Sequence, residues 1–179
     1  MKITKKTSIE DLGALICQKL QDTGIESFLS GGAVVSIYSN NKYESYDLDF
    51  VSVGDRKKIK AVMESLGFSQ EKSRHFIHPK TLYFVEFPGT SMMIGDQKIQ
   101  EFVEIKRNEN ILKLLSPTDC VKDRLAAYIH WNDFQCLVQA ALVAKIQGAN
   151  HKKIQEFCKL EGKSQAFDDF KKQLAVLND

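Results

Sequence analysis

The sequence lacks the features of a membrane or secreted protein. Its longest apolar stretch, residues 140–144, is far shorter than the roughly 20 residues of a membrane-spanning helix. The four cysteines, Cys17, Cys120, Cys136 and Cys158, show neither Cys-x-x-Cys pairs nor the dense spacing of a disulfide framework or zinc site. We therefore expect a cytoplasmic protein with reduced thiols, no membrane partner and no structural zinc.

An excess of one charge is also missing. The chain has 25 Lys and Arg against 23 Asp and Glu, a formal net charge of +2, with 43% hydrophobic and 27% charged residues. This composition is that of an ordinary globular protein, so a disordered chain is excluded, and nucleic-acid binding would require the basic residues to cluster. We interpret the lysines at 57–60 and 152–163 as solvated helix faces, and His75 and His78 as exposed loop residues.

The first half of the chain mixes helical and strand patterns. Apolar residues at helical spacing predict helices over 9–23, 33–38 and 55–66. Period-two alternation and β-rich composition predict strands over 27–29, 47–53 and 82–87, with weaker candidates over 100–105 and 111–115. We therefore expect an α+β first domain over residues 1–115, built on a short mixed β-sheet flanked by helices.

The second half shows only helical patterns. Ser116 as cap and Pro117 in the first position predict a helix start, and breaks near Gly148 and Gly162 separate helices over 117–130, 132–147, 150–161 and 164–177. We expect Trp131 to be buried and the phenylalanines of the last two helices to form a core. Residues 116–179 are thus predicted to be a C-terminal helical bundle packed on the first domain.

Two acidic residues stand two apart on a predicted strand. Asp47 and Asp49 share one strand face, while Leu48 and Phe50 face the other way. Two carboxylates on one face repel each other unless a cation or water separates them, and hard oxygen ligands favour Mg²⁺. The pair therefore indicates either a magnesium site or a solvated strand edge.

Two further features are ambiguous when each is taken alone. Gly31 and Gly32 stand between a strand and a helix, where paired glycines let a phosphate approach the backbone, although most such pairs are simple turns. Glu86 interrupts the apolar strand 83–87, so its side chain either faces solvent or joins a polar site.

The order of these features resembles the signature of the DNA polymerase β-type nucleotidyltransferase superfamily. The matching residues are Leu29-Ser30-Gly31-Gly32-Ala33, followed by Ser45-Tyr46-Asp47-Leu48-Asp49-Phe50-Val51 and the strand that carries Glu86. The sequence looks most like the minimal nucleotidyltransferases and the abortive-infection toxins. The resemblance implies the nucleotidyltransferase fold.

The resemblance also implies roles for residues of the first half. Asp47, Asp49 and Glu86 would be catalytic and would hold Mg²⁺ or Mn²⁺. Ser30, Gly31, Gly32 and Ser45 would bind the nucleoside triphosphate.

In the helical half the match is looser. By resemblance, Lys122, Arg124 and Asp133 would also serve nucleotide binding. Tyr43 and Trp131 stand where this branch has basic residues.

The implied activity is transfer of a nucleotidyl group from a nucleoside triphosphate to an acceptor, which is RNA, protein or a small molecule. The intact aspartate pair and glycine turn favour this enzyme. The departures at Tyr43 and Trp131 favour an alternative, a non-catalytic binding module of the same fold that is part of a toxin–antitoxin pair. A third reading is a plain α/β interaction domain whose match is accidental.

Overall fold

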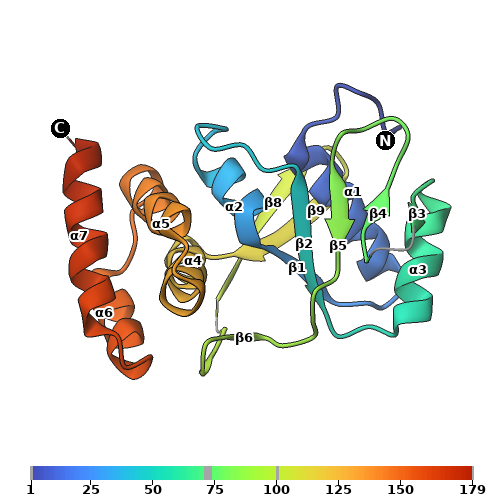
Figure 1. Ribbon diagram of the computed structural model, residues 1–179. Helices are drawn as coiled ribbons and strands as arrows, with labels where there is room; N and C mark the ends of the chain where they lie inside the picture. Colours follow the sequence, from blue (N-terminus) through green and yellow to red (C-terminus); the bar gives the residue numbers. More distant parts are fainter. Residues whose placement is uncertain (1, 71–73, 100, 179) are drawn as a thin grey trace. The chain divides into compact units, whose positions relative to one another are not determined.

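The computed structural model describes residues 2–70, 74–99 and 101–178 (Figure 1). Backbone contacts divide the chain into two compact units, which we call the sheet unit and the helical unit. The sheet unit comprises Met1–Ala33, Ser45–Ser91 and Val103–Leu114, and the helical unit comprises Val34–Glu44, Met92–Phe102 and Leu115–Asp179. The helical unit thus takes two segments from the part of the chain that precedes residue 116.

A mixed sheet is the basis of the sheet unit. In the described residues it has seven strands in the order β3-β4-β5-β2-β1-β9-β8. β2 is antiparallel to β1 and parallel to β5, and β1 is parallel to β9. The short mixed sheet predicted from the sequence is confirmed. The strands are β1 (Ser27–Ser30), β2 (Asp47–Ser52), β3 (Ser69–Gln70), β4 (Phe76–Ile77), β5 (Phe84–Glu86), β8 (Phe102–Arg107) and β9 (Asn110–Leu115).

Strand β2 is buried on alternate residues, as its period-two pattern predicts. Leu48 and Phe50 are fully buried, whereas Asp47 and Asp49 are only partly covered. Helix α1 (Ile9–Asp22) lies on the Leu48 side, where a side chain on Gly13 would contact Leu48. The two aspartates therefore face away from the α1 side of the sheet.

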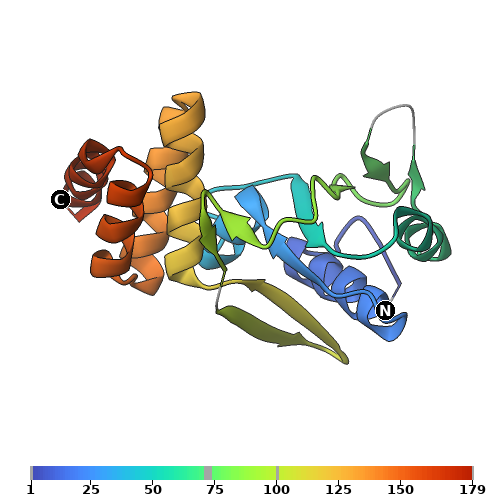
Figure 2. The same ribbon diagram turned by 90° about the horizontal axis from the view of Figure 1, so that it is seen from below.

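Two helices of the sheet unit begin within one residue of their predicted starts, and the helix predicted over 33–38 begins at Gly31. Ser8 caps α1 by accepting a hydrogen bond from the Asp11 backbone N–H, and Asp55 caps α3 (Arg56–Ser65) by accepting from Lys57 and Lys58. Figure 2 shows α1 as the blue helix, and the β8–β9 hairpin as the olive ribbon. Helix α2 (Gly31–Tyr38) starts in the sheet unit and continues into the helical unit.

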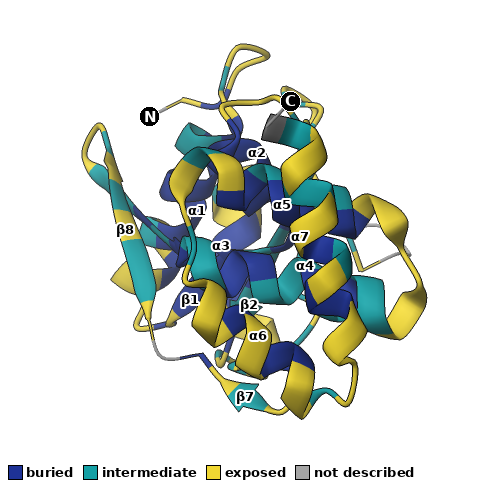
Figure 3. Ribbon diagram, turned by 90° about the vertical axis from the view of Figure 1, so that its left-hand side faces the viewer, coloured by how far each residue is buried: buried dark blue, intermediate teal, exposed yellow. Residues whose placement is uncertain are grey.

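The helical unit contains a small hairpin and the predicted helices. Its hairpin pairs β6 (Met93–Ile94) with β7 (Gln97–Lys98), and neither strand was predicted. Phe157 and Phe170 are fully buried and Phe167 nearly so, which confirms the predicted aromatic core. Figure 3 shows dark blue, buried stretches along the helices of this unit beside exposed yellow ones. The helices are α4 (Pro117–Trp131), α5 (Phe134–Gln147), α6 (His151–Leu160) and α7 (Ser164–Asn178).

The prediction that Trp131 is buried is wrong, because the side chain is 78% exposed. Trp131 is the last residue of α4, and Asn132 then adopts a left-handed conformation that turns the chain into α5. A helix end at such a turn has no neighbouring turn to cover its last side chain. Among the described residues, no helix is both long and apolar enough to span a membrane.

Candidate functional site

Three neighbouring strands of the sheet unit bring predicted site residues together. Ser30 at the end of β1 pairs with Asp49 on β2, and Asp49 pairs in turn with Glu86 on β5. Asp47 lies two residues before Asp49 on the same strand face. The Ser30 hydroxyl donates to the Asp49 carbonyl oxygen at 3.2 Å. Four of the predicted residues therefore lie side by side on adjoining strands.

Gly31 lies directly against one of these carboxylates. Its φ is +72°, a left-handed conformation that favours glycine, and an added Cβ would lie 2.4 Å from the Asp49 carboxylate oxygen Oδ2. Any side chain at this position would have to displace that carboxylate. Gly32 follows in the first turn of α2, so the predicted glycine turn borders the acidic residues.

Asp47 has an unfavourable environment for a negative charge. Its Oδ1 is buried and, in the described part of the chain, has no hydrogen-bond partner. Burial, reinforced by the charges of Asp49 and Glu86, raises the pKa of Asp47 to about 7. A cation bound at this carboxylate would relieve both effects.

The raised pKa of Asp47 gives the protein a specific pH dependence. The folded protein holds this proton more tightly than the unfolded chain, so the free energy of unfolding should fall as the pH rises from about 4 to about 7. Because solvent reaches part of the carboxyl group and screens its charge, we expect the free energy of unfolding to fall by only ~2 kcal/mol over this pH range. In denaturant titrations at a series of pH values without divalent cations, Asp47→Asn should remove this component and be more stable than wild type at pH 8. If the free energy of unfolding of Asp47→Asn fell with pH as steeply as that of wild type, Asp47 would not be the group responsible.

Glu86 has a partner that the sequence did not reveal. The His75 imidazole and the Glu86 carboxylate form an ion pair, and the His75 ring lies 4.8 Å from that of Phe84, centroid to centroid. His75 was predicted to be an exposed loop residue, yet its side chain is only 40% exposed. Because β4 is only two residues long, its pairing with β5 left no signal in the sequence.

A complete three-ligand metal cluster is not preformed. Within the described residues, no group of three or more His, Cys, Asp and Glu side chains is arranged to hold a metal ion. Ser45 serves the backbone here, since its hydroxyl donates to the Asp47 carbonyl oxygen at 3.1 Å and accepts from the Asp47 N–H at 3.2 Å. It shapes the chain that leads into β2.

In the helical unit, Arg124 belongs to a mostly buried polar cluster. Its Nε and Nη2 donate to Oδ2 of Asp123 at 3.0 and 2.6 Å, and its Nη1 lies 3.8 Å from the Cys136 sulfur. Burial lowers the pKa of Arg124, but the attraction of Asp123 and its neighbours outweighs burial and raises it above the ordinary value. Asp133 caps α5 by accepting from the Gln135 N–H at 2.9 Å, and also accepts from the Cys136 thiol.

We expect the Arg124 cluster to contribute to folding. Arg124→Met should lower the free energy of unfolding by roughly 2–3 kcal/mol, because it leaves the Asp123 carboxylate without its partner in a poorly hydrated place. The double variant Arg124→Met/Asp123→Leu should recover most of that loss. Denaturant titration measures both, and an Arg124→Met protein as stable as wild type would contradict this role.

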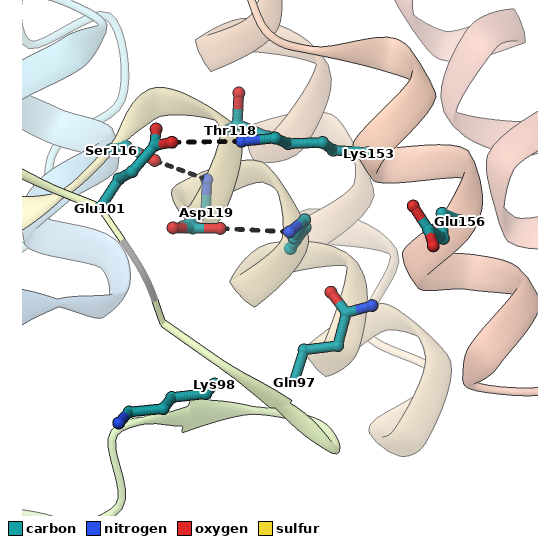
Figure 4. A pocket seen from close by; sticks show the side chains of 9 residues that line it. Gln97, Lys98, Glu101, Ser116, Thr118, Asp119, Lys153 and Glu156 are labelled. Carbon is teal, nitrogen blue, oxygen red and sulfur yellow. Dashed lines mark hydrogen bonds and ion pairs between the residues drawn. The ribbon is translucent and has the colours of Figure 1, made fainter.

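Lys122 lines a cavity of about 330 Å³ in the helical unit. Figure 4 shows this cavity, with Asp119, Glu101 and Lys153 among the side chains that line it. The Lys122 amino group lies 3.3 Å from an Asp119 carboxylate oxygen, and both side chains are nearly nine-tenths buried. At the same cavity, Lys153 pairs with Glu101 at 3.2 Å. Two of the lysines that line the cavity, Lys122 and Lys153, are thus paired with carboxylates, and an anion bound there would compete with Asp119 for Lys122.

Comparisons by sequence find no relative: no protein-family model matches the chain, and no curated protein is similar to it. Comparisons by structure find proteins of similar fold. An antigenic nucleotidyltransferase-like protein from Paracoccidioides brasiliensis matches with a TM-score of 0.60 and 18% identity over 97% of this chain and 94% of that one.

The antibiotic-resistance factor ANT(2'')-Ia matches in two structures. Its solution structure gives a TM-score of 0.54 at 13% identity, over 98% of this chain and 97% of that one. Its crystal structure in complex with adenylyl-2''-tobramycin matches with a TM-score of 0.54 at 12% identity, over 89% of this chain and 96% of that one. At these identities the likeness is one of fold, so the protein has the fold of nucleotidyltransferases, an α+β sheet followed by helices.

Proposed function

We propose that the protein is a metal-dependent nucleotidyltransferase that moves a nucleotidyl group from a nucleoside triphosphate to a hydroxyl-bearing acceptor. The observation that carries the proposal is the alignment of Asp47, Asp49 and Glu86 on adjoining strands, with Gly31 against the Asp49 carboxylate. The similarity of fold to ANT(2'')-Ia supports it.

The aspartate pair fits a divalent cation. Asp47 carries a buried oxygen without a hydrogen-bond partner and repelling charges beside it, which is the environment that a cation stabilises. Mg²⁺ commonly binds one or two carboxylates together with substrate phosphates and waters, so two aspartates suffice without a third protein ligand. We propose that Asp47 and Asp49 hold Mg²⁺ or Mn²⁺, with Glu86 beside them. The ion would neutralise charge on the phosphates.

The chain's own groups would position the reactants. Gly31 stands at the start of α2, against the Asp49 carboxylate, and the N-terminus of a helix attracts anions such as the phosphates of a nucleotide. Gly32 extends this turn, and Ser30 holds the Asp49 backbone. In this scheme the acceptor oxygen attacks the α-phosphorus, the bond to the β-phosphate breaks and pyrophosphate leaves. The hydroxyl proton passes to Glu86, whose carboxylate is oriented by His75.

The acceptor is the least constrained part of the proposal. ANT(2'')-Ia was crystallised with adenylyl-2''-tobramycin, a nucleotidylated small molecule. RNA, a protein and a small hydroxylated molecule are all candidate acceptors for this chain. A role as an abortive-infection toxin would follow if the acceptor were an essential RNA or protein.

A second candidate is a non-catalytic module that binds nucleotide or a partner protein, as one half of a toxin–antitoxin pair. Two observations favour it: Glu86 is engaged by His75, and Arg124 is engaged by Asp123. In this conformation neither Glu86 nor Arg124 points its charge toward a ligand, because each is paired with another side chain of the protein.

Calorimetric titration of ATP, GTP, CTP and UTP, each with and without Mg²⁺, tests the proposal. We expect at least one nucleotide to bind with micromolar affinity only when Mg²⁺ is present. A folded protein that binds none of the four would rule out the enzyme and leave the protein-binding module.

A further inference from the structure

A hollow in the sheet unit, separate from the carboxylates, is lined by basic and aromatic side chains. It encloses about 250 Å³, and none of the described residues that line it is acidic. Helix α3 contributes three basic residues and Ile59, and a fourth basic residue lies just before β4. One aromatic residue comes from β4, another directly follows β5, and Gln70 completes the lining. We call it the basic groove, and its main residues are Arg56, Lys57, Lys60, Arg74, Phe76 and Phe87.

The basic groove shares two strands with the candidate active site. His75 and Glu86 form an ion pair, and the residues that follow them, Phe76 and Phe87, contact each other edge to face at 5.8 Å. Side chains alternate across a strand, so the acid–histidine pair and the phenylalanine pair lie on opposite faces of β4 and β5. The groove therefore lies on the other face of β4 and β5 from the Glu86 side chain.

The positive charge of the groove is largely uncompensated. Among the described residues, Arg56, Lys57 and Arg74 are exposed and form no ion pair. Lys60 pairs with Glu64 at 3.8 Å, but both side chains are about half exposed, so that pair is weak. Because the net charge of the chain is small, nucleic-acid binding requires a cluster of basic residues. The basic groove is such a cluster.

We propose that the basic groove binds single-stranded nucleic acid. Four cationic side chains from two elements suit successive phosphates, and arginine also binds phosphate through two parallel hydrogen bonds. The Phe87 ring, partly exposed and backed by Phe50 at 5.9 Å, provides a flat surface on which a base can stack. The hollow of about 250 Å³ suits one nucleotide unit, and the exposed cations at its rim suit the phosphates on either side of that unit.

This inference deepens the proposed function, on which its catalytic meaning rests: a nucleic-acid strand held in the groove would have to continue past β4 and β5 for one of its hydroxyls to reach the carboxylates on the opposite face of the sheet. Binding itself requires neither a metal ion nor a nucleotide. The groove can therefore be tested separately from the reaction.

The test is the fluorescence anisotropy of a short labelled single-stranded RNA, titrated with the full chain in EDTA at several salt concentrations. Lys57→Gln/Lys60→Gln/Arg74→Gln should raise the Kd at least about 10-fold and make the slope of log affinity against log salt shallower by about 2. The control Lys5→Gln/Lys6→Gln/Lys58→Gln removes the same charge from exposed residues outside the groove and should change the Kd less than about twofold. Equal losses in both triple variants would overturn the proposal.

Two further arms separate nucleic acid from anions in general. Phe87→Leu should weaken binding of the RNA but not of inorganic polyphosphate, and equal binding of both probes to wild type would reduce the groove to a general anion site. Asp47→Asn/Asp49→Asn should keep its RNA affinity. If the protein binds RNA but no nucleotide, the proposed reaction is refuted and the proposal for the groove is supported. If it binds nucleotide but no RNA, the proposal for the groove is refuted and the proposed reaction is not.

Discussion

Asp47→Asn/Asp49→Asn should weaken Mg²⁺-dependent nucleotide binding by more than about 100-fold, because it removes both charges that hold the ion and the phosphates it bridges. The substitution is nearly isosteric, and Asp47 is destabilising as a charge in its buried position. We therefore expect the variant to stay folded and, without divalent cations, to melt at the same or a higher temperature than wild type. Calorimetry and thermal melting measure the two effects.

The matched control removes the same charge elsewhere. Asp22 and Asp168 are exposed residues that form surface ion pairs, and Asp22 also accepts a hydrogen bond from Gln18, so Asp22→Asn/Asp168→Asn should leave nucleotide affinity within about twofold. Addition of Mg²⁺ with nucleotide should raise the melting temperature of wild type and of this control, but not of the Asp47/Asp49 variant. Binding that survives in the Asp47/Asp49 variant would show that the cation lies elsewhere.

Gly31→Ala should abolish nucleotide binding while costing only about 1–2 kcal/mol of stability. The stability cost comes from a left-handed backbone at φ +72°. The larger effect comes from the new Cβ, which would lie 2.4 Å from the Asp49 carboxylate oxygen and must push that carboxylate out of place. Denaturant titration and nucleotide calorimetry on the same samples separate the two quantities.

Gly24 provides the control for backbone strain. Its φ is +74°, almost that of Gly31, but a Cβ added there would meet nothing within 4 Å. Gly24→Ala should therefore cost a similar ~1–2 kcal/mol and leave nucleotide affinity unchanged. If both substitutions had the same effect on binding, the contact between Gly31 and Asp49 would have no functional role.

The sequence predicted those elements whose signal is local. Strand β2 follows from strict alternation, with Leu48 and Phe50 buried and the aspartates on the other face. Helix α4 follows from its cap at Ser116 and from Pro117 in the first turn. In both elements, residues that are close together in the sequence determine the structure.

The features that the sequence missed depend on distant contacts. β4 is two residues long and exists because β5 pairs with it, so neither the strand nor the approach of His75 to Glu86 has a pattern of its own. Cys136 approaches the Arg124 guanidinium only in the fold, whereas the role of Arg124 in nucleotide binding stays a prediction. The grouping of Arg74 with the lysines of α3 likewise appears only in the fold.

The most direct test of nucleotidyl transfer uses two labels on the same nucleotide. The protein is incubated with Mg²⁺ and the nucleotide that it binds, labelled on either the α- or the γ-phosphate, together with RNA, a protein fraction or hydroxylated small molecules. The account predicts that the α-label is incorporated into one acceptor class, that the γ-label is released as pyrophosphate, and that Asp47→Asn/Asp49→Asn does neither. Incorporation of the γ-label, or of no label into any acceptor, would contradict it.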